Sequence, residues 1–135
     1  MITGIAHACF VVRNLDAALE FYQRQLGLTH AFDFKNEQGV RTGVYLLLGR
    51  RTFIELFQGT HADASDAPSY KHICLEVDDI QATVKTLRKN AVQVTDPILG
   101  KDQSFQAWMT DPDGNRIELH QYTATSWQAT WLDKR

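Results

Sequence analysis

An internal repeat limits the folds open to this 135-residue chain more than any other feature of its sequence. With His7 placed over His72, residues 7–19 (HACFVVRNLDAAL) align with residues 72–84 (HICLEVDDIQATV), an offset of 65. With Glu55 placed over Glu118, residues 54–58 (IELFQ) align with residues 117–121 (IELHQ), an offset of 63, and four of the five residues are identical. The two offsets differ by two residues, which is a typical difference in loop length between related modules. The sequence therefore predicts two copies of one module.

Both copies show the same order of periodic segments. In the first, alternation predicts a strand over 4–12, a helix opened by Asn14 or Asp16 and ended at Gly27, and strands at 28–35, 41–49 and 51–58. In the second, we expect a strand at 70–77, a helix opened by Asp78 or Asp79, and strands near 92–96, 104–110 and 115–122. Residues 111–114 (DPDG) form a strong turn signal. Each copy thus reads β-α-β-β-β.

These segments predict an α+β fold made of two βαβββ modules in tandem. The first module covers 1–58, a polar linker covers 59–69, the second module covers 70–122, and a C-terminal extension covers 123–135. A module of about 65 residues is marginal as an independent fold. We therefore expect the modules to share an interface or to pair with a second chain, most simply in a homodimer. The extension is expected to cover the site or to pack on a partner chain.

Composition narrows the class of protein. The chain is 44% hydrophobic and 22% charged, with a net charge of −2 and a pI near 6.2, which gives no reason to expect nucleic-acid binding. No apolar run approaches the roughly 20 residues of a membrane span, and no signal peptide is recognisable. The two cysteines, Cys9 and Cys74, are interpreted as reduced core residues, with ligand or disulfide roles as the alternatives. We predict a cytoplasmic protein with a small-molecule partner.

The repeat also pairs four residues that can ligate a metal: His7 and Glu55 in the first module, His72 and Glu118 in the second. Two imidazoles and two carboxylates suit one divalent ion. Zn²⁺, Ni²⁺ and Co²⁺ are favoured, and Fe²⁺ and Mn²⁺ are the alternatives. On strands, alternate side chains share a face, so Phe53 and Phe57 lie beside Glu55, and Arg116 and His120 beside Glu118. These four residues and Trp108 are candidates for a substrate pocket, with core packing as the alternative for the aromatic rings and His120.

Several motifs resemble the vicinal-oxygen-chelate superfamily, also called the glyoxalase/bleomycin-resistance/dioxygenase superfamily. They are His7, residues 15–22 (LDAALEFY) with 26–28 (LGL), residues 54–56 (IEL), residues 72–80 (HICLEVDDI) and residues 111–119 (DPDGNRIEL). The resemblance covers about residues 3–122. It implies paired βαβββ modules whose mixed sheet curls into a cup around a metal, often completed by dimerisation. It leaves open whether the site lies within one chain or across a dimer.

The ligand set favours one chemistry within that family. Members similar to glyoxalase I use a His, Glu, His, Glu set, which His7, Glu55, His72 and Glu118 match. The resemblance implies a lyase or isomerase that moves a proton next to a carbonyl through a metal-stabilised enediolate, with Glu118 or Glu55 as the base and Glu118 preferred by analogy. The alternatives are an Fe²⁺ extradiol-type dioxygenase, which would need only the two histidines and Glu118, and a non-catalytic ligand-sequestering or resistance protein.

Two positions depart from the glyoxalase I pattern. Bacterial enzymes of that type carry an arginine four residues past the first histidine and an asparagine shortly after the first glutamate, and both help to bind glutathione. Here those positions hold Val11 and about Gly59. The expected substrate is therefore a small hydroxy-carbonyl compound that need not be a glutathione adduct.

Overall fold

The computed structural model describes residues 5–60 and 72–134. The chain divides into two compact units, Met1–Asp66 and Ala67–Arg135. Of the linker predicted at 59–69, residues 61–69 lie outside the described residues. In the described part of the chain, no helix is long and apolar enough to cross a membrane.

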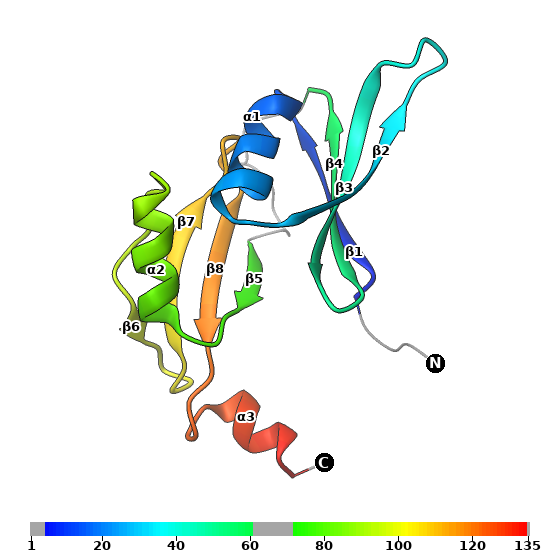
Figure 1. The fold of residues 1–135 in the computed structure, drawn as a ribbon. Helices are drawn as coiled ribbons and strands as arrows, with labels where there is room; N and C mark the ends of the chain where they lie inside the picture. Colours follow the sequence, from blue (N-terminus) through cyan, green and yellow to red (C-terminus); the bar gives the residue numbers. More distant parts are fainter. Residues whose placement is uncertain (1–4, 61–71, 135) are drawn as a thin grey trace. The chain divides into compact units, whose positions relative to one another are not determined.

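Unit 1 is one open, four-stranded mixed sheet with a helical segment (Figure 1). Its elements are β1 (His7–Val12), α1 (Leu15–Leu19), a π-helical continuation η1 (Glu20–Gln25), β2 (Thr29–Lys35), β3 (Arg41–Gly49) and β4 (Thr52–Gln58). The strand order is β1-β4-β3-β2. Strands β1 and β4 run parallel, and the other neighbours run antiparallel.

Unit 2 repeats this arrangement and adds a helix. Its elements are β5 (Ile73–Glu76), α2 (Ile80–Lys89), β6 (Ile98–Leu99), β7 (Phe105–Thr110), β8 (Arg116–Gln121) and α3 (Trp127–Leu132). The strand order is β5-β8-β7-β6, with β5 and β8 parallel. The predicted α+β architecture of two tandem βαβββ modules is confirmed.

One strand lies elsewhere than predicted. Residues 92–96 are not a strand, and the short β6 follows at Ile98–Leu99. The backbone N–H of Thr95 does donate to the Trp108 carbonyl at 3.0 Å, but the Trp108 N–H donates to the Thr95 hydroxyl at 2.9 Å. Because a side chain takes the place of a backbone acceptor, no regular ladder forms at the predicted position.

The helix of unit 1 begins as predicted but changes type. The Asn14 side chain accepts a hydrogen bond from the Ala17 N–H at 3.0 Å, which caps α1. After Leu19 the segment widens to a π-helix, so the Leu26 N–H donates to the carbonyl of Phe21, five residues earlier. Gly27 follows with a φ of +79°, the left-handed conformation that ends a helix and favours glycine.

The repeated glutamine of the IELxQ motif attaches each helix to its sheet. The Gln58 Oε1 atom accepts a hydrogen bond from the Leu15 N–H at 2.7 Å, and Gln121 Oε1 accepts one from the Ile80 N–H at 2.8 Å. In both units the donor is the first residue of the helix, whose N–H has no partner inside the helix. The glutamine therefore satisfies a helix terminus from the end of the last strand.

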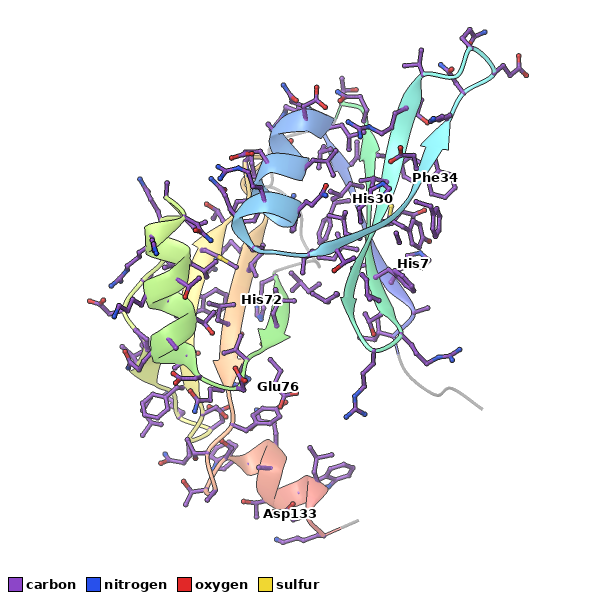
Figure 2. The ribbon with its side chains drawn as sticks, in the orientation of Figure 1. His7, His30, Phe34, His72, Glu76 and Asp133 are labelled. Atoms are coloured by element: carbon purple, nitrogen blue, oxygen red, sulfur yellow. The ribbon has the colours of Figure 1, made fainter. Side chains whose placement is uncertain are left out.

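Burial alternates along the strands and defines two faces of each sheet. In unit 1, Phe10, Ile54 and Leu56 are buried on the side of the helix, and α1 packs against β4. The opposite face carries His7 and Phe34 (Figure 2). In unit 2, α2 packs against β7 and β8 over a matching apolar core. The core of unit 2 contains Ile80, Val84, Leu87, Val92, Ala107, Met109, Ile117 and Leu119.

The turn predicted at 111–114 is present and organised by one buried carboxylate. Asp111 Oδ1 accepts hydrogen bonds from the N–H groups of Asp113 at 2.9 Å and Asn115 at 2.8 Å. Gly114 adopts a φ of +82°, which a side chain would strain. The turn fixes where β8 begins, and with it the position of Glu118.

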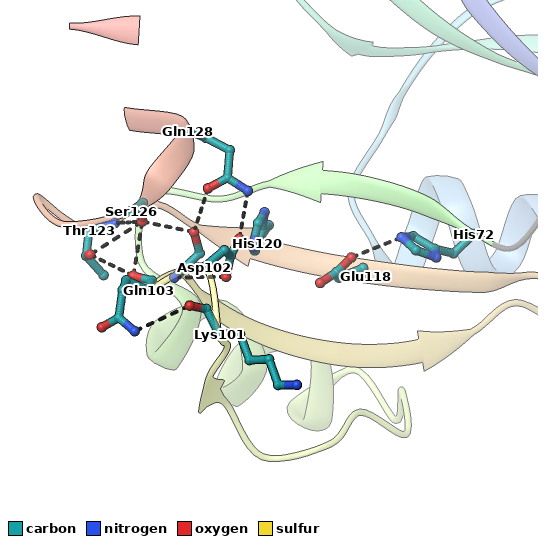
Figure 3. A network of polar contacts seen from close by, with 10 residues as sticks. His72, Lys101, Asp102, Gln103, Glu118, His120, Thr123, Ser126 and Gln128 are labelled. Atoms are coloured by element: carbon teal, nitrogen blue, oxygen red, sulfur yellow. Dashed lines mark hydrogen bonds and ion pairs between the residues drawn. The ribbon is translucent and has the colours of Figure 1, made fainter. Parts of the chain in front are cut away.

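The start of the C-terminal helix α3 is held by the loop before β7 (Figure 3). The Trp127 N–H donates to the Asp102 carbonyl at 3.0 Å, and Gln128 Nε2 donates to the Asp102 carboxylate at 2.7 Å. The buried hydroxyls of Ser104 and Ser126 lie 2.9 Å apart. The predicted extension thus forms a helix that is attached to unit 2 itself.

We expect replacement of Gln121 by alanine to destabilise the protein by about 1–2 kcal/mol, because it removes the acceptor for the first N–H of α2. The measurement is urea unfolding followed by circular dichroism. The exposed Gln93 offers a matched control in the same unit, and Gln93→Ala should change the free energy of unfolding by less than about 0.5 kcal/mol. Equal effects of the two substitutions would contradict the assigned role.

The Asp102 carboxylate gives a pH-dependent contribution to stability. The hydrogen bond from Gln128, with further help from the Ser104 N–H and the nearby His120, lowers the pKa of Asp102. A carboxyl whose pKa is lower in the folded state stabilises it above the unfolded-state value of about 3.9, and that contribution disappears as the pH falls through the folded-state pKa.

Asp102→Asn should therefore lower the free energy of unfolding at pH 7, and the difference from the parent should shrink below about pH 4. Urea unfolding at pH 7, 5 and 3 measures it. Asp133→Asn, at the exposed end of α3, is the control and should show no comparable loss at pH 7. A difference that is the same at pH 7 and pH 3 would show that the charge of Asp102 does not contribute.

Candidate metal centre

In unit 1, His7 and Glu55 come together across the parallel strands β1 and β4. The register places Glu55 opposite Cys9, one pleat along from His7 on the same face. His7 Nε2 lies 3.4 Å from Glu55 Oε2, and the two side chains are 42% and 13% exposed. The predicted pair is thus assembled within the unit, with the imidazole accessible and the carboxylate mostly buried.

In unit 2, His72 and Glu118 repeat this geometry. Glu118 on β8 lies opposite Cys74 on β5, and His72 immediately precedes β5. His72 Nε2 lies 3.1 Å from Glu118 Oε2 (Figure 3), and the side chains are 34% and 11% exposed. The sequence repeat is therefore also a repeat of two His–Glu pairs whose Nε2 and Oε2 atoms lie close together.

An aromatic ring stands beside each histidine, at equivalent positions of the two sheets. Tyr45 lies opposite Glu55 in the β3–β4 ladder, and its hydroxyl lies 3.3 Å from His7 Nδ1. Trp108 lies opposite Glu118 in the β7–β8 ladder, and its ring meets the His72 ring edge-on at 4.9 Å between centroids. Tyr45 was not predicted as a site residue. It lies 63 residues before Trp108, which is the offset that relates Glu55 to Glu118.

The cysteines were expected in the core, and this expectation is wrong: both residues are exposed and free. They share the face of the histidine in their own unit, away from the buried side of the sheet. Partial burial of the thiol and its contact with the Glu55 carboxylate raise the pKa of Cys9 to about 11. Burial and the negative charge of Glu118 raise the pKa of Cys74 to about 12. Next to an unliganded carboxylate, both thiols are therefore protonated at neutral pH.

The donor atoms fit a divalent ion. Ligands about 2.1 Å from a metal lie roughly 3.0–3.4 Å apart when they occupy neighbouring positions, and both Nε2–Oε2 distances fall in this range. Among the described residues, no lysine or arginine forms an ion pair with Glu55 or Glu118. Each unit by itself supplies two ligands, and the described residues hold no group of three or more such side chains around one point.

The pocket candidates of unit 1 belong to a larger set of aromatic rings. Phe53 and Phe57 are half-buried on the face of Glu55, and each touches a further ring. The Phe53 and Tyr45 ring centroids lie 5.6 Å apart, and those of Phe57 and Phe34 lie 5.1 Å apart. Phe32 stacks on Tyr45 at 4.7 Å. Phe32 and Phe34, which sequence analysis did not select, are 48% and 36% exposed and extend this aromatic face along β2.

The pocket candidates of unit 2 are polar by contrast. The guanidinium carbon of Arg116 lies 4.4 Å from the centroid of the Trp108 ring, a cation–π contact beside the His72–Glu118 pair. His120 Nε2 lies 3.3 Å from Asp102 Oδ2, so His120 joins the network that holds α3. The candidates Trp108 and Arg116 therefore adjoin the His72–Glu118 pair, whereas His120 has a structural partner.

Comparison with known proteins agrees with these features. The sequence pattern of the Glyoxalase/Bleomycin resistance protein/Dioxygenase superfamily matches residues 4–119. The metallothiol transferase FosB of Staphylococcus epidermidis is 33% identical over 88% of this chain and 82% of its own length. A probable lactoylglutathione lyase of Vibrio cholerae is 32% identical over 87% of this chain and 89% of its own.

A solved structure shares the fold. The glyoxalase family protein from Enterococcus faecalis superposes with a TM-score of 0.75 at 23% identity, covering 87% of this chain and 96% of its own. The match of the family pattern to most of the chain, the repeated βαβββ units and the two His–Glu pairs lead to one assignment. The chain belongs to the glyoxalase/bleomycin resistance protein/dioxygenase superfamily.

Proposed function

We propose that His7, Glu55, His72 and Glu118 together bind one divalent metal ion, and that the protein is a metal-dependent lyase or isomerase of the glyoxalase I type. The observation that carries the proposal is the second His–Glu pair. Metal chemistry with only two histidines and Glu118 as ligands would not require a carboxylate at position 55. Yet Glu55 is 13% exposed and lies 3.4 Å from the His7 imidazole, in the arrangement that Glu118 has with His72.

The proposed reaction moves a proton between two carbons, one of which carries a carbonyl. A bound divalent ion supplies stabilisation of the negative charge that develops on the carbonyl oxygen. Glu118 is preferred as the base by family analogy; its mostly buried carboxylate lies beside the His72 imidazole and the Cys74 thiol, and it can take a proton at Oε2 and return it to the neighbouring carbon. His72 is held edge-on to Trp108, which fixes the direction of its Nε2 atom.

The substrate proposed is a small hydroxy-carbonyl compound rather than a glutathione adduct. By the resemblance to glyoxalase I, Val11 and about Gly59 match the positions that help those enzymes to bind glutathione, and neither has a polar side chain. A Cβ atom added to Gly59 would lie 2.8 Å from Val11 Cγ1, so an asparagine at this position would require the Val11 side chain to move. The aromatic face of unit 1 further supports an organic substrate with apolar parts.

A second candidate function is a metallothiol transferase, which the similarity to FosB favours. That chemistry would need His7, His72 and Glu118 as ligands and would leave Glu55 outside the metal's coordination. The two candidate functions therefore differ in the role of Glu55, and substitution of this one residue can distinguish them.

Titration of chelator-treated protein with Zn²⁺ or Ni²⁺ in a calorimeter tests the metal site. We expect one ion per chain, and we expect His7→Ala and His72→Ala each to weaken binding by more than about 100-fold, because each removes a direct ligand. His30→Ala is the control, since His30 pairs with Asp33 on β2 and should not matter. Absence of binding, or equal affinity in all variants, would refute the site.

Glutamine substitutions at the two glutamates test the chemistry. Solvent deuterium incorporation next to the carbonyl of hydroxyacetone, followed by NMR, should fall by roughly 10²–10⁴-fold in Glu118→Gln because the base is lost. Glu55→Gln should weaken metal affinity as well. Unchanged metal affinity in Glu55→Gln, together with metal-dependent consumption of a thiol, would instead support the transferase. Glu37→Gln, in the exposed turn between β2 and β3, is the matched control.

A further inference from the structure

Among the residues that the structure describes, Arg116 is the cationic side chain closest in register to the His72–Glu118 pair. It is the first residue of β8 and lies on the same face as Glu118, two positions along the strand. Its guanidinium carbon stands 4.4 Å from the centre of the Trp108 ring, and the same ring meets His72 edge-on. One indole thus positions both an imidazole of the proposed metal site and a guanidinium.

No ion pair joins Arg116 to an acid in the described part of the chain. Three other arginines have such partners: Arg24 pairs with Glu20, Arg41 with Asp16 at 3.0 Å, and Arg88 with Asp96 at 2.7 Å. Arg116 is exposed, and its guanidinium lies over the Trp108 ring. A guanidinium stacked on a ring keeps the N–H groups along its edge free to donate.

We propose that Arg116, held by Trp108, binds a carboxylate group of the substrate beside His72 and Glu118. This inference rests on the proposed function, and it makes the substrate class a hydroxy-carbonyl or oxo compound that also carries a carboxylate. The planar guanidinium offers two parallel N–H donors to a carboxylate, and stacking on the indole limits the side-chain freedom lost on binding. The corresponding residue of unit 1 is Phe53, so only one copy of the repeat carries the charge.

Two ligands that differ only in the carboxylate provide the test. Hydroxyacetone and hydroxypyruvate share the hydroxy-carbonyl unit, and hydroxypyruvate carries a carboxylate in place of the methyl group. Binding is followed by Trp108 fluorescence in Zn²⁺-loaded protein with Trp127→Phe and Trp131→Phe, which leaves Trp108 as the one tryptophan of the three. Calorimetric titration of Zn²⁺ verifies that each variant keeps its metal affinity.

With Arg116 present, we expect hydroxypyruvate to bind at least about tenfold more tightly than hydroxyacetone. Arg116→Gln should reduce this ratio by about tenfold and leave the affinity for hydroxyacetone unchanged. Arg116→Lys should retain part of the preference, because a lysine keeps the charge without the planar pair of donors. An unchanged ratio in Arg116→Gln would overturn the proposal, since direct binding of the carboxylate to Zn²⁺ would then explain the preference.

An experiment on metal-free protein distinguishes failure of the Arg116 proposal from failure of the proposed metal-dependent function. Titration with hydroxypyruvate should still change Trp108 fluorescence, the change should weaken with added salt, and Arg116→Gln should abolish it. If this response is present while Zn²⁺ is not bound, the carboxylate site stands and the proposed metal site fails. If Zn²⁺ binds as proposed but Arg116→Gln alters neither experiment, Arg116 has no role in recognition. A response to inorganic phosphate equal to that of hydroxypyruvate would overturn the carboxylate preference.

Discussion

The parallel pairing of the first and last strands is the constraint on which the rest of each unit depends. Parallel neighbours cannot be joined by a tight turn, so the chain must leave β1 through a helix and return through two further strands before β4 can lie beside it. That route separates His7 from Glu55 by most of a module in sequence and brings their side chains to 3.4 Å. Unit 2 has the same connection between its parallel strands β5 and β8, and His72 Nε2 lies 3.1 Å from Glu118 Oε2.

Periodicity and the internal repeat were enough to predict the order of strands and helices and the two His–Glu pairs. The repeat identified both His–Glu pairs because it matched residues whose roles depend on the same pairing of strands. It did not reveal that Gln58 and Gln121 bind the helix N-termini, because a side chain that reaches across 43 or 41 residues leaves no local pattern. The strand near 92–96 was misplaced because the Thr95 hydroxyl replaces a backbone acceptor. Helix α3 was missed because six residues are too few for a periodic signal.

The two units have kept one backbone plan and diverged on the face that carries the candidate ligands. In unit 1 that face is aromatic, with Phe32 and Phe34 joined to Tyr45 and Phe57. In unit 2 it is polar, with Arg116 beside Trp108. Divergence is tolerated here because these side chains do not form the core, which lies on the other side of each sheet. The identical positions include the His–Glu pairs, the cysteines beside them and the glutamines that bind the helix N-termini.

The surroundings of Glu55 and Glu118 favour a nearby positive charge. Glu55 and Glu118 are 13% and 11% exposed, and removing a carboxylate from water is costly unless positive charge compensates it. Their close neighbours are an imidazole and a cysteine thiol, and the raised pKa of each thiol means that it offers a proton rather than a charge. No lysine or arginine of the described residues pairs with either carboxylate. The divalent ion proposed above would supply positive charge next to these carboxylates.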